Sequence, residues 1–349
     1  PVSLYDAVRE LPLDIDEYEL DLLSLQARPD FERKTTLVRL RGAGEEGIGE
    51  DVTYHGEEHD RLQDRGPDLP LRGSWTLHTF SEHLATLPLF DAEPAQHAYY
   101  DYRRWGFESA ALDLALRQAG TSLGDAIGRT AQPVSFVVSG GLGDPPSTAR
   151  IREWLGFYDG LRFKLDANSS WSEALISELA ATGAVDSIDF KGQYRGTVVD
   201  TPPDPVLYRR VAEGLPNAWL EDPALTDETT EVLEPHRDRV TWDAIIHSVD
   251  DIEALPWPPR TVNVKPSRFG SVERLFAAYD YCEASGIGAY GGGQWELGNG
   301  RGHIQLLAAL NHPDTPNDVA PGEYNLDPQA GLPSSPLTVT PRETGFQAL

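Results

Sequence analysis

Ionisable side chains recur at the ends of predicted strands in the second half of the chain. In sequence order they are Lys164 and Asp166, Asp189 and Lys191, Glu221, Asp243, and Lys265. Side chains two positions apart in a strand point to the same side, so each of the two pairs can face one site. Carboxylates grouped in this way suit a hard cation such as Mg²⁺, and a neighbouring amine can serve as a general acid or base. The spacing therefore predicts a site for metal-assisted proton transfer.

The lysine usage of the chain sharpens this prediction. Four lysines (Lys34, Lys164, Lys191 and Lys265) stand against 25 arginines. An amine can release its proton, whereas a guanidinium stays charged, so lysines kept in an arginine-rich chain are candidates for chemistry. Lys34 opens an exposed-looking strand and is interpreted as an ordinary surface cation. The other three each end a short run of β-branched or aromatic residues.

Alternating strand and helix patterns position these side chains. The predicted strands are 134–140, 161–167, 186–191, 217–222, 239–244, 261–266, 286–291 and 317–320. The helix-like segments between them are 148–157, 171–183, 205–214, 225–236, 249–255, 270–284 and 301–311. Eight strands that alternate with helices indicate an α/β fold of the (β/α)₈ type, in which chemistry takes place at the C-terminal ends of the strands. We therefore expect the seven side chains to converge on one barrel mouth.

The first hundred residues follow a different pattern. Three strands are predicted at 17–27, 33–41 and 47–54, followed by a polar and then helical segment. We divide the chain into an N-terminal α+β capping domain, residues 1–95, and a barrel, residues 96–330. The Pro-rich tail, residues 331–349, is expected to pack back on the first domain. The capping loops that we expect over the barrel mouth carry Gln26, Phe31, Tyr54 and His55.

Charge and composition exclude several classes of partner. The net charge of −27 repels nucleic acids and anionic bilayers. Apolar runs are far shorter than the ~20 residues of a membrane span, and the single cysteine, Cys282, cannot form an internal disulfide. These features predict a cytoplasmic protein that acts on a small molecule. An anionic substrate would need a local group of cations to offset the overall field.

Longer sequence segments resemble the enolase superfamily, in particular its mandelate racemase and muconate lactonizing enzyme branch. The segments are GIGEDVTY, FESAALDLALRQAG, WLEDP, VNVKPSRFGSVERLFAAYDYCEASGI and GGGQWELGNGRGHIQLLAAL, in this order. The resemblance covers nearly the whole chain and marks it as a divergent member.

The resemblance implies a Mg²⁺ ion held by acids on barrel strands three, four and five, which map to Asp189, Glu221 and Asp243. The family's lysine at the end of strand six maps to Lys265. Its two-lysine motif on strand two maps to Lys164 and Asp166, so the second lysine is an aspartate here.

That departure leaves two registers open. Strand counting makes 161–167 the second strand, with Asp189 as the metal ligand. However, the segment LDANSSW resembles the motif that the family has on strand three. In that register Asp166 would bind the metal. Lys191 has no assigned counterpart, and we hypothesise that it replaces the missing lysine in space.

The resemblance implies abstraction of the proton α to a carboxylate, with Mg²⁺ stabilising an enediolate. We prefer Lys265 as the base because fewer acids stand near it in the sequence, and Lys164 as the acid or as a cation that holds the substrate. Arg268 is a candidate substrate contact, and Glu296 could orient a lysine. Asp222 follows a ligand on its strand and is expected to point away.

Lysines without a histidine base favour a dehydratase like o-succinylbenzoate synthase, a cycloisomerase or an epimerase. The identity of the carboxylate substrate and the oligomeric state stay open, although such barrels often form homo-oligomers through their outer helices.

Two other classes of function remain as alternatives. A noncatalytic relative that binds a metal or a carboxylate is compatible with the altered strand-two motif. A phosphate-handling barrel would use a Gly-rich anion site after strand seven, for which GGGQWELGNG is the candidate.

Overall fold

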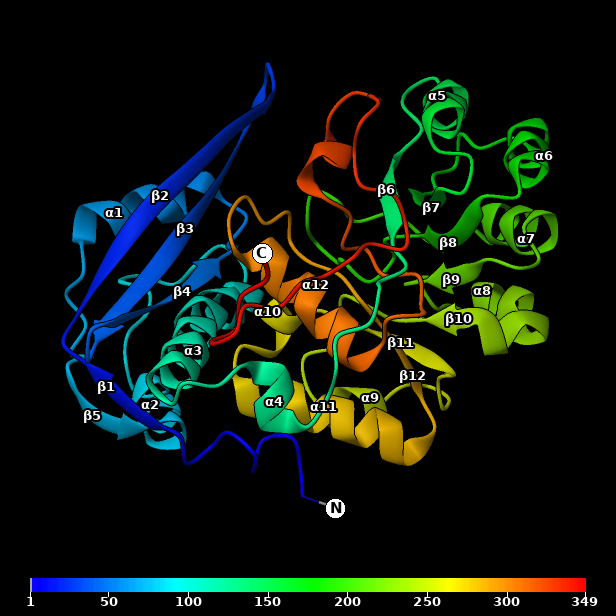
Figure 1. Ribbon diagram of the computed structural model, residues 1–349. Coiled ribbons are helices and arrows are strands. Elements are labelled where there is room, and N and C mark those ends of the chain that lie inside the picture. Colours follow the sequence, from blue (N-terminus) through cyan, green and yellow to red (C-terminus); the bar gives the residue numbers. More distant parts are fainter. Residues whose placement is uncertain (1) are drawn as a thin grey trace.

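The computed structural model describes residues 2–349. Its N-terminal part is a three-stranded antiparallel sheet in the order β2 (Glu17–Arg28), β3 (Phe31–Gly42) and β4 (Glu45–Asp51). The three predicted strands are confirmed. The long hairpin of β2 and β3 projects from the molecule at the side away from the chain's N-terminus (Figure 1).

Helix α3 (Ala98–Gln118) covers this sheet, and two glycines of β4 make the close contact feasible. A Cβ atom on Gly47 would lie 2.3 Å from the carbonyl oxygen of Ala110, and one on Gly49 would lie 2.0 Å from that of Gly106. The glycines of GIGE are therefore required for helix packing. Beside this layer, β1 (Pro12–Ile15) pairs with β5 (Gly73–Thr76), a small sheet that the sequence pattern did not reveal, and α1 (Gly56–Arg65) and α2 (Leu77–Leu84) complete the domain.

The second part of the chain is a parallel barrel. Its strands are β6 (Val137–Gly141), β7 (Arg162–Asp166), β8 (Val185–Asp189), β9 (Trp219–Glu221), β10 (Val240–Thr241), β11 (Thr261–Val264) and β12 (Gly288–Gly291). Strands β6 to β10 form one sheet, and β11 pairs with β12. The amide of Asn263 donates to the carbonyl of Trp242 at 2.9 Å and so joins β11 to β10.

Residues 317 and 318 close the barrel. Asn317 forms a parallel bridge to Phe136, and Asp318 forms one to Gly292. The predicted eighth strand is thus reduced to two bridges, but it occupies its expected place. The (β/α)₈-type fold predicted from the sequence is confirmed.

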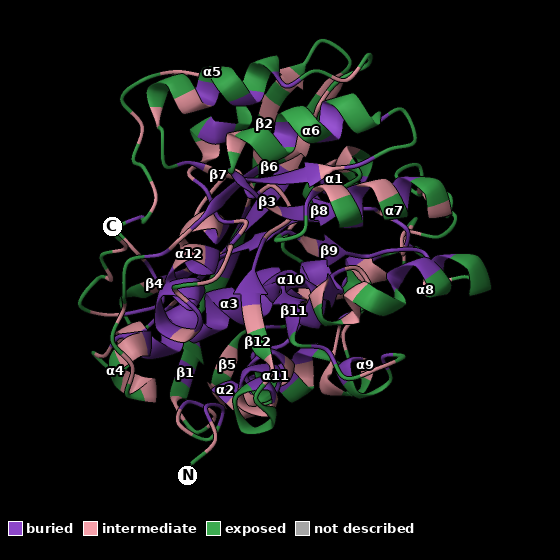
Figure 2. Ribbon diagram, turned by 90° about the vertical axis from the view of Figure 1, so that its right-hand side faces the viewer, coloured by how far each residue is buried: buried purple, intermediate pink, exposed green. Residues whose placement is uncertain are grey.

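Most of the helices lie outside the strands with their exposed faces outward, whereas the short α10 is buried (Figure 2). They are α4 (Leu123–Ile127), α5 (Ala149–Phe157), α6 (Glu173–Thr182), α7 (Pro205–Gly214), α8 (Asp227–Leu233), α9 (Val249–Glu253), α10 (Pro266–Phe269), α11 (Val272–Ser285) and α12 (Gly300–Asn311). Two 3₁₀ turns, Glu234–Arg239 and Gly322–Asn325, complete the regular structure. Side-chain caps such as Ser172 on α6 and Asp204 on α7 define several helix starts. Within residues 2–349, no helix combines the length and apolar character needed to cross a membrane.

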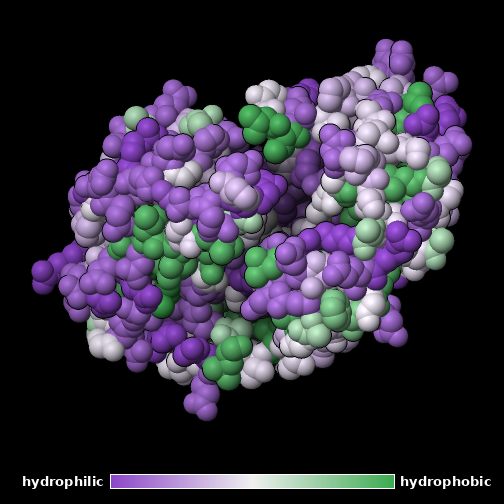
Figure 3. Space-filling view, turned by 90° about the horizontal axis from the view of Figure 1, so that it is seen from above, coloured by the Kyte–Doolittle hydropathy of each residue, from purple (hydrophilic) through white to green (hydrophobic). Residues whose placement is uncertain are grey.

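The two parts meet through α3 and the C-terminal tail. The predicted domain boundary near residue 95 precedes α3, yet α3 packs on the capping sheet. The tail returns to the same helix, where the amide of Phe346 donates to Asp113 Oδ1 at 2.7 Å and the Gln347 side chain donates to Asp113 Oδ2 at 2.9 Å. Seen from above, a hollow with mostly hydrophilic residues around it separates the capping domain from the barrel (Figure 3).

Candidate active site

Strand register brings the predicted acids to one level of the barrel. Asp166 pairs in register with Asp189, and Asp189 pairs with Glu221. Asp189 and Glu221 are buried, and their carboxylate oxygens lie within 4.8 Å of each other and of an oxygen of Asp222. Because β7 is the second barrel strand and β8 the third, the strand count used in the prediction holds in the structure, and 186–191 is not an inserted strand.

All three barrel lysines reach this group of acids. Lys164 Nζ lies 2.6 Å from Glu221 Oε1, and Lys265 Nζ lies 2.9 Å from Asp243 Oδ2. Lys191 Nζ lies 3.2 Å from Asp189 Oδ2. The fourth lysine, Lys34, instead pairs with Asp60 in the capping domain at 2.9 Å.

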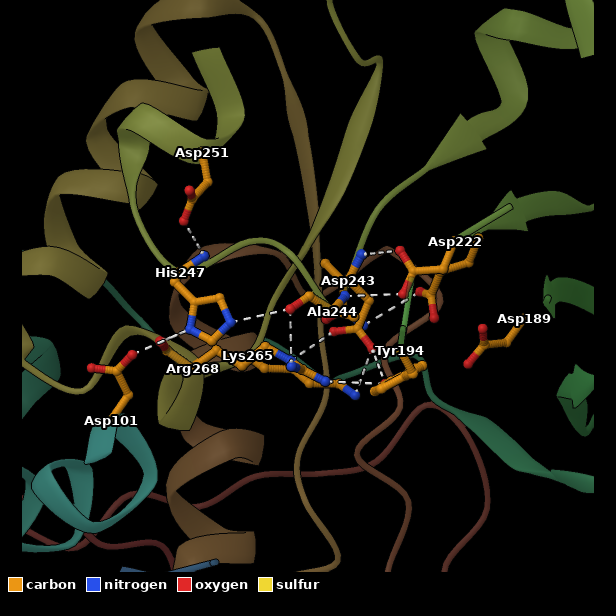
Figure 4. A network of polar contacts seen from close by, with 12 residues as sticks. Asp101, Asp189, Tyr194, Asp222, Asp243, Ala244, His247, Asp251, Lys265 and Arg268 are labelled. Carbon is orange, nitrogen blue, oxygen red and sulfur yellow. Dashed lines mark hydrogen bonds and ion pairs between the residues drawn. The ribbon is translucent and has the colours of Figure 1, made fainter. Parts of the chain in front are cut away.

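Asp243 follows β10 and is held by two cations (Figure 4). Arg268 Nε lies 3.2 Å from its Oδ1, and the buried Arg268 also donates to the Tyr194 hydroxyl at 3.1 Å. Burial alone would raise the pKa of Asp243, but Arg268 and Lys265 outweigh it and hold that pKa well below its usual range. Asp243 is therefore a carboxylate at neutral pH.

Asp222 takes part in a way that its strand position did not predict. Its backbone is left-handed, with φ +51°, and its carboxylate turns towards the next strand. There Oδ1 accepts the amide of Asp243 at 2.8 Å and Oδ2 accepts the amide of Ala244 at 3.0 Å (Figure 4). Asp222 thus fixes the backbone that carries Asp243.

Glu221 has two further polar neighbours that sequence reasoning missed. The hydroxyl of Tyr290, on β12, donates to Glu221 Oε2, and the Asn263 side chain donates to the same oxygen at 3.4 Å. Tyr290 also meets the hydroxyl of Thr241 at 3.2 Å. The available signal was the period-two spacing of Tyr290 and Asn263 within their strands, but apolar neighbours made both look like core residues.

Nearby carboxylates raise the pKa of two of the three barrel lysines. Burial would lower the pKa of Lys164, yet Glu221, with Asp318 and Asp189 further away, raises it well above its ordinary range. The same balance, with Asp189 and Asp166 as the acids, raises the pKa of Lys191. Both amines are therefore held as cations by these carboxylates.

Lys191 lies where the missing strand-two lysine could be replaced. Its backbone has φ +50°, and its ammonium lies between Asp189 and Asp166, 3.5 Å from Asp166 Oδ1. Asp166 is not among the acids whose oxygens lie within 4.8 Å of one another. The structure thus brings Lys191 to the site and places Asp166 at its edge.

The donor set fits a divalent cation. Glu221 Oε1 and Asp243 Oδ1 are buried and accept no hydrogen bond from the described residues, although each faces a cation. Buried oxygens without such a partner are costly unless a charge or metal satisfies them. Carboxylates without a thiol or imidazole nearby suit Mg²⁺. The acids whose oxygens lie within 4.8 Å of one another are Asp189, Glu221 and Asp222, whereas the oxygens of Asp243 face Lys265 and Arg268 beside this group. Asp222 is the poorer ligand because both its oxygens already accept backbone amides.

Glu296 lies in the loop after β12, but it does not contact a lysine. Its Oε1 accepts the amide of Gln294 at 2.6 Å, and burial raises its pKa. The same loop contains the Gly-rich segment considered for phosphate. Its amides at Leu297, Gly298 and Gly300 bind the carboxylate of Glu50 instead, at 2.8 to 3.1 Å, so a phosphate would have to displace the protein's own acid.

A cavity of about 560 Å³ lies between the capping domain and the barrel loops, with Arg268 and Tyr194 in its wall. In a chain with a net charge of −27, no acid lines it. His55, His97 and Arg195 line it together with Arg268. Of the predicted capping residues His55 reaches the cavity, whereas Phe31 stacks on Tyr54 at a ring separation of 5.8 Å and Gln26 bonds within its own hairpin.

His247 ties the back of the site to the capping domain (Figure 4). Its Nδ1 lies 3.2 Å from Asp101 Oδ2 on α3 and 2.8 Å from the carbonyl of Arg268. Its Nε2 faces the carbonyl of Ala244 at 3.1 Å. The contacts hold the two barrel loops that carry Asp243 and Arg268, so His247 supports the site without facing the cavity.

Comparison with known proteins agrees with the fold and the site. Two solved structures align over nearly the whole chain at 20% identity. A Mg²⁺ complex of dipeptide epimerase from Methylococcus capsulatus has a TM-score of 0.70 and covers 97% of this chain and 99% of its own. A muconate cycloisomerase from Pseudomonas fluorescens has a TM-score of 0.66 and covers 97% and 93%.

Curated relatives point the same way. An N-succinylamino acid racemase from Thermus thermophilus is 26% identical over 88% of this chain and 85% of its own length. An o-succinylbenzoate synthase from Geobacillus stearothermophilus is 23% identical over 80% and 75%. The predicted resemblance to the enolase superfamily is confirmed, with a capping domain and a barrel whose mouth holds acids and lysines.

Within that fold class the chain has a more specific placement. It belongs to the family described as domain of unknown function DUF8230, whose N-terminal domain matches residues 6–126 and whose C-terminal domain matches residues 130–326. The two matches meet after α3, in agreement with the packing of that helix on the capping sheet.

Proposed function

We propose that this protein is a Mg²⁺-dependent enzyme that abstracts the proton α to a carboxylate and then eliminates a leaving group or returns the proton. The observation that carries the proposal is the convergence of Lys164 and Lys265 on Glu221 and Asp243 at the barrel mouth. The names of the relatives, a racemase, a synthase, an epimerase and a cycloisomerase, support a lyase or isomerase.

Asp189, Glu221 and Asp243 would hold the Mg²⁺ ion, and Asp222 would orient Asp243 through its backbone. When bound there, Mg²⁺ would supply a Lewis acid for the negative charge that grows on the substrate carboxylate as the proton leaves. Asp189 is preferred to Asp166 because its oxygens lie with those of Glu221.

The lysines would divide the proton transfers between them. Lys265 Nζ takes the α-proton, and the charged Lys164 faces it from β7 as the acid or as the cation that holds the substrate. The raised pKa of Lys164 supports that role. Lys191 adds a third positive charge beside Asp189. Glu296 keeps the loop over Lys265 in shape through its bond to the Gln294 amide.

The substrate of this proposal is a small-molecule carboxylate. The cavity without acids supports it, since Arg268, Arg195 and two histidines line this space in a chain of net charge −27. Positive charge concentrated there would offset the repulsion between an anion and the rest of the chain.

The test is exchange of the substrate α-proton with solvent deuterium, followed by NMR, on N-succinylamino acids with Mg²⁺. We expect exchange in the unaltered protein and none in Lys265→Ala. Lys265→Arg is the decisive variant because it keeps the charge but cannot release a proton, so a base predicts loss of exchange in this variant too. Exchange that survives in Lys265→Arg would contradict the assignment of the base.

Asp166 supports one competing function, because it stands where the family motif has a lysine. A noncatalytic carboxylate-binding protein would bind Mg²⁺ and N-succinylamino acids without exchange. Calorimetry on the same samples separates the two functions, since tight binding with no exchange in any variant favours the binding protein.

A further inference from the structure

The loop after β12, residues 292–299, packs directly on the proposed base. A Cβ atom on Gly292 would lie 3.0 Å from Lys265 Cε and 3.6 Å from Asn263 Nδ2, so the loop backbone forms one wall around the Lys265 side chain. Further along the loop, Trp295 has a left-handed backbone with φ +57°. A conformation of this kind needs support from surrounding groups.

The capping domain supplies a negative charge to one half of this loop. Glu50 on β4 is buried, and its carboxylate accepts the amides of Leu297, Gly298 and Gly300. All of these partners are backbone amides at the start of α12, where the helix dipole also favours an anion. A Cβ atom on Gly300 would lie 2.8 Å from Glu50 Oε1, so the glycine permits this approach.

The capping domain supplies a positive charge to the other half. Arg33 on β3 is completely buried, and each of its five N–H donors reaches a backbone carbonyl. Two of these are in the loop, where Nη2 donates to Gln294 at 2.6 Å and Nε donates to Trp295 at 3.3 Å. The other three carbonyls, at 2.9 to 3.0 Å, belong to residues 34, 52 and 53 of the capping domain itself.

Arg33 and Glu50 are unusual because both of these buried charges bind backbone groups of the loop and do not pair with each other. A buried charge is costly unless every lone pair or donor is satisfied, and apolar packing would join two domains without that cost. A guanidinium that holds carbonyls and a carboxylate that holds amides define the position of the loop at both of its ends. Apolar contacts alone would allow it to slide.

We propose that Arg33 and Glu50 are positioning residues for Lys265. They act from the capping domain through the loop 292–299, so that the base is in place when the capping domain is docked. The inference rests on the proposed function in assigning Lys265 as the base, but the coupling between the two charges and Lys265 can be measured without any substrate.

Each residue has a matched control on its own strand. Glu50→Gln is compared with Glu46→Gln on β4, whose carboxylate pairs with Arg39 and Arg41. Arg33→Lys is compared with Arg39→Lys on β3. Arg33→Lys keeps the charge but cannot make the five bonds, so it isolates the geometry of the guanidinium.

The first measurement uses the small number of lysines. The full chain is treated briefly with an amine-acetylating reagent, and mass spectrometry follows the modification rates of Lys34, Lys164, Lys191 and Lys265 separately. We expect Glu50→Gln and Arg33→Lys to raise the rate at Lys265 at least fivefold relative to Lys164, with no such change in the two controls. If Glu50→Gln does not fold, Glu50→Asp keeps the charge but shortens its reach, and carries the same expectation.

The second measurement is the exchange reaction of the proposed function. Positioning predicts that kcat falls at least tenfold in both variants while KM stays within about threefold, because the cavity of Arg268 and Tyr194 lies apart from this loop. Unchanged kcat together with faster labelling would overturn the positioning role.

Two other results would also overturn the inference. In one, the rate at Lys265 matches that of the controls. In the other, the acetylation rates of Lys164 and Lys265 rise equally, which would mean that the whole barrel mouth becomes more accessible to the reagent. If the unaltered protein shows no exchange on any N-succinylamino acid, the proposed function fails and the labelling rates alone decide this inference.

Discussion

Two groups of buried polar residues in the barrel, one at its seam and one at its mouth, are organised in different ways. At the seam where residues 317–318 close the barrel, Asn317 is neutral and fully bonded. Its Nδ2 donates to the carbonyls of Ser135, His312 and Thr315 at 3.0 to 3.1 Å, and its Oδ1 accepts the Gly291 amide at 2.7 Å and His312 Nδ1 at 2.8 Å. The Asn317 side chain is therefore fully bonded, although His312 Nε2 beside it is buried without a hydrogen bond.

At the mouth the groups are charged and are held together as ion pairs. One buried oxygen of Glu221 faces Lys164 at 2.6 Å, and one of Asp243 faces Arg268 at 3.2 Å, so both are held by cations and not by neutral donors. A neutral side chain with every bond made stabilises a fold, whereas carboxylates held by cationic side chains can exchange those partners for a ligand or metal. The difference separates a structural network from a site, and it can be tested at both places.

The largest effect is expected at the mouth. Lys164→Met should lower kcat for α-proton exchange by about 10² to 10⁴, the usual contribution of a positioned acid or base. The control is Lys34→Met, which removes a lysine from the capping surface and should leave kcat unchanged. An equal loss of kcat in the two variants would mean that Lys164 contributes no more to the reaction than a lysine outside the barrel mouth.

The next largest effect is expected at the seam, and on stability alone. Asn317→Ala leaves several buried carbonyls and one amide without their partner, which should lower the free energy of unfolding by about 3 kcal/mol. Urea unfolding measures this loss. At a temperature where the variant is folded, α-proton exchange should stay within about twofold of the unaltered protein.

Mg²⁺ should stabilise the protein through the mouth. A ligand at a hundred times its Kd adds about 2.7 kcal/mol to the free energy of unfolding. We expect the melting temperature to rise with Mg²⁺ and to fall back when the ion is chelated. Glu221→Gln should abolish the rise, whereas Glu228→Gln on the surface of α8 should preserve it.

The smallest effect is pH dependence near the seam and the tail. Burial lowers the pKa of His312 and of His303 to about 4. Because the unfolded chain takes up these protons at about pH 6.5, stability is complete above that pH and is lost as the pH falls towards 4. At pH 5 each buried histidine should lower the free energy of unfolding by about 2 kcal/mol relative to pH 7. Urea unfolding gives the free energy of unfolding at pH 7 and at pH 5, and His312→Asn should reduce the difference between the two values by the contribution of His312. An unchanged difference would contradict the lowered pKa of His312.

Much of the site was predictable because strands impose a simple geometry. Asp189, Glu221, Asp243 and Lys265 each stand at or just beyond a strand end, and Lys164 lies two residues before the end of β7. Parallel strands must bring such ends together. Tyr290 and Asn263 were missed, and the prediction that Asp222 points away was wrong, each for a physical reason. A polar residue inside an apolar strand is read as core, and the turn of Asp222 towards Asp243 depends on a left-handed backbone that no pattern of residue types reveals.

Periodicity and residue type were enough to predict the barrel, its capping sheet and the seven ionisable side chains at its mouth, because these follow from local rules that act over a few residues. Which charges pair with one another depends on distances between strands that are remote in the chain. Only the folded structure shows that Glu50 fills the Gly-rich loop and that Arg33 holds its other end, because both contacts join residues about 250 positions apart.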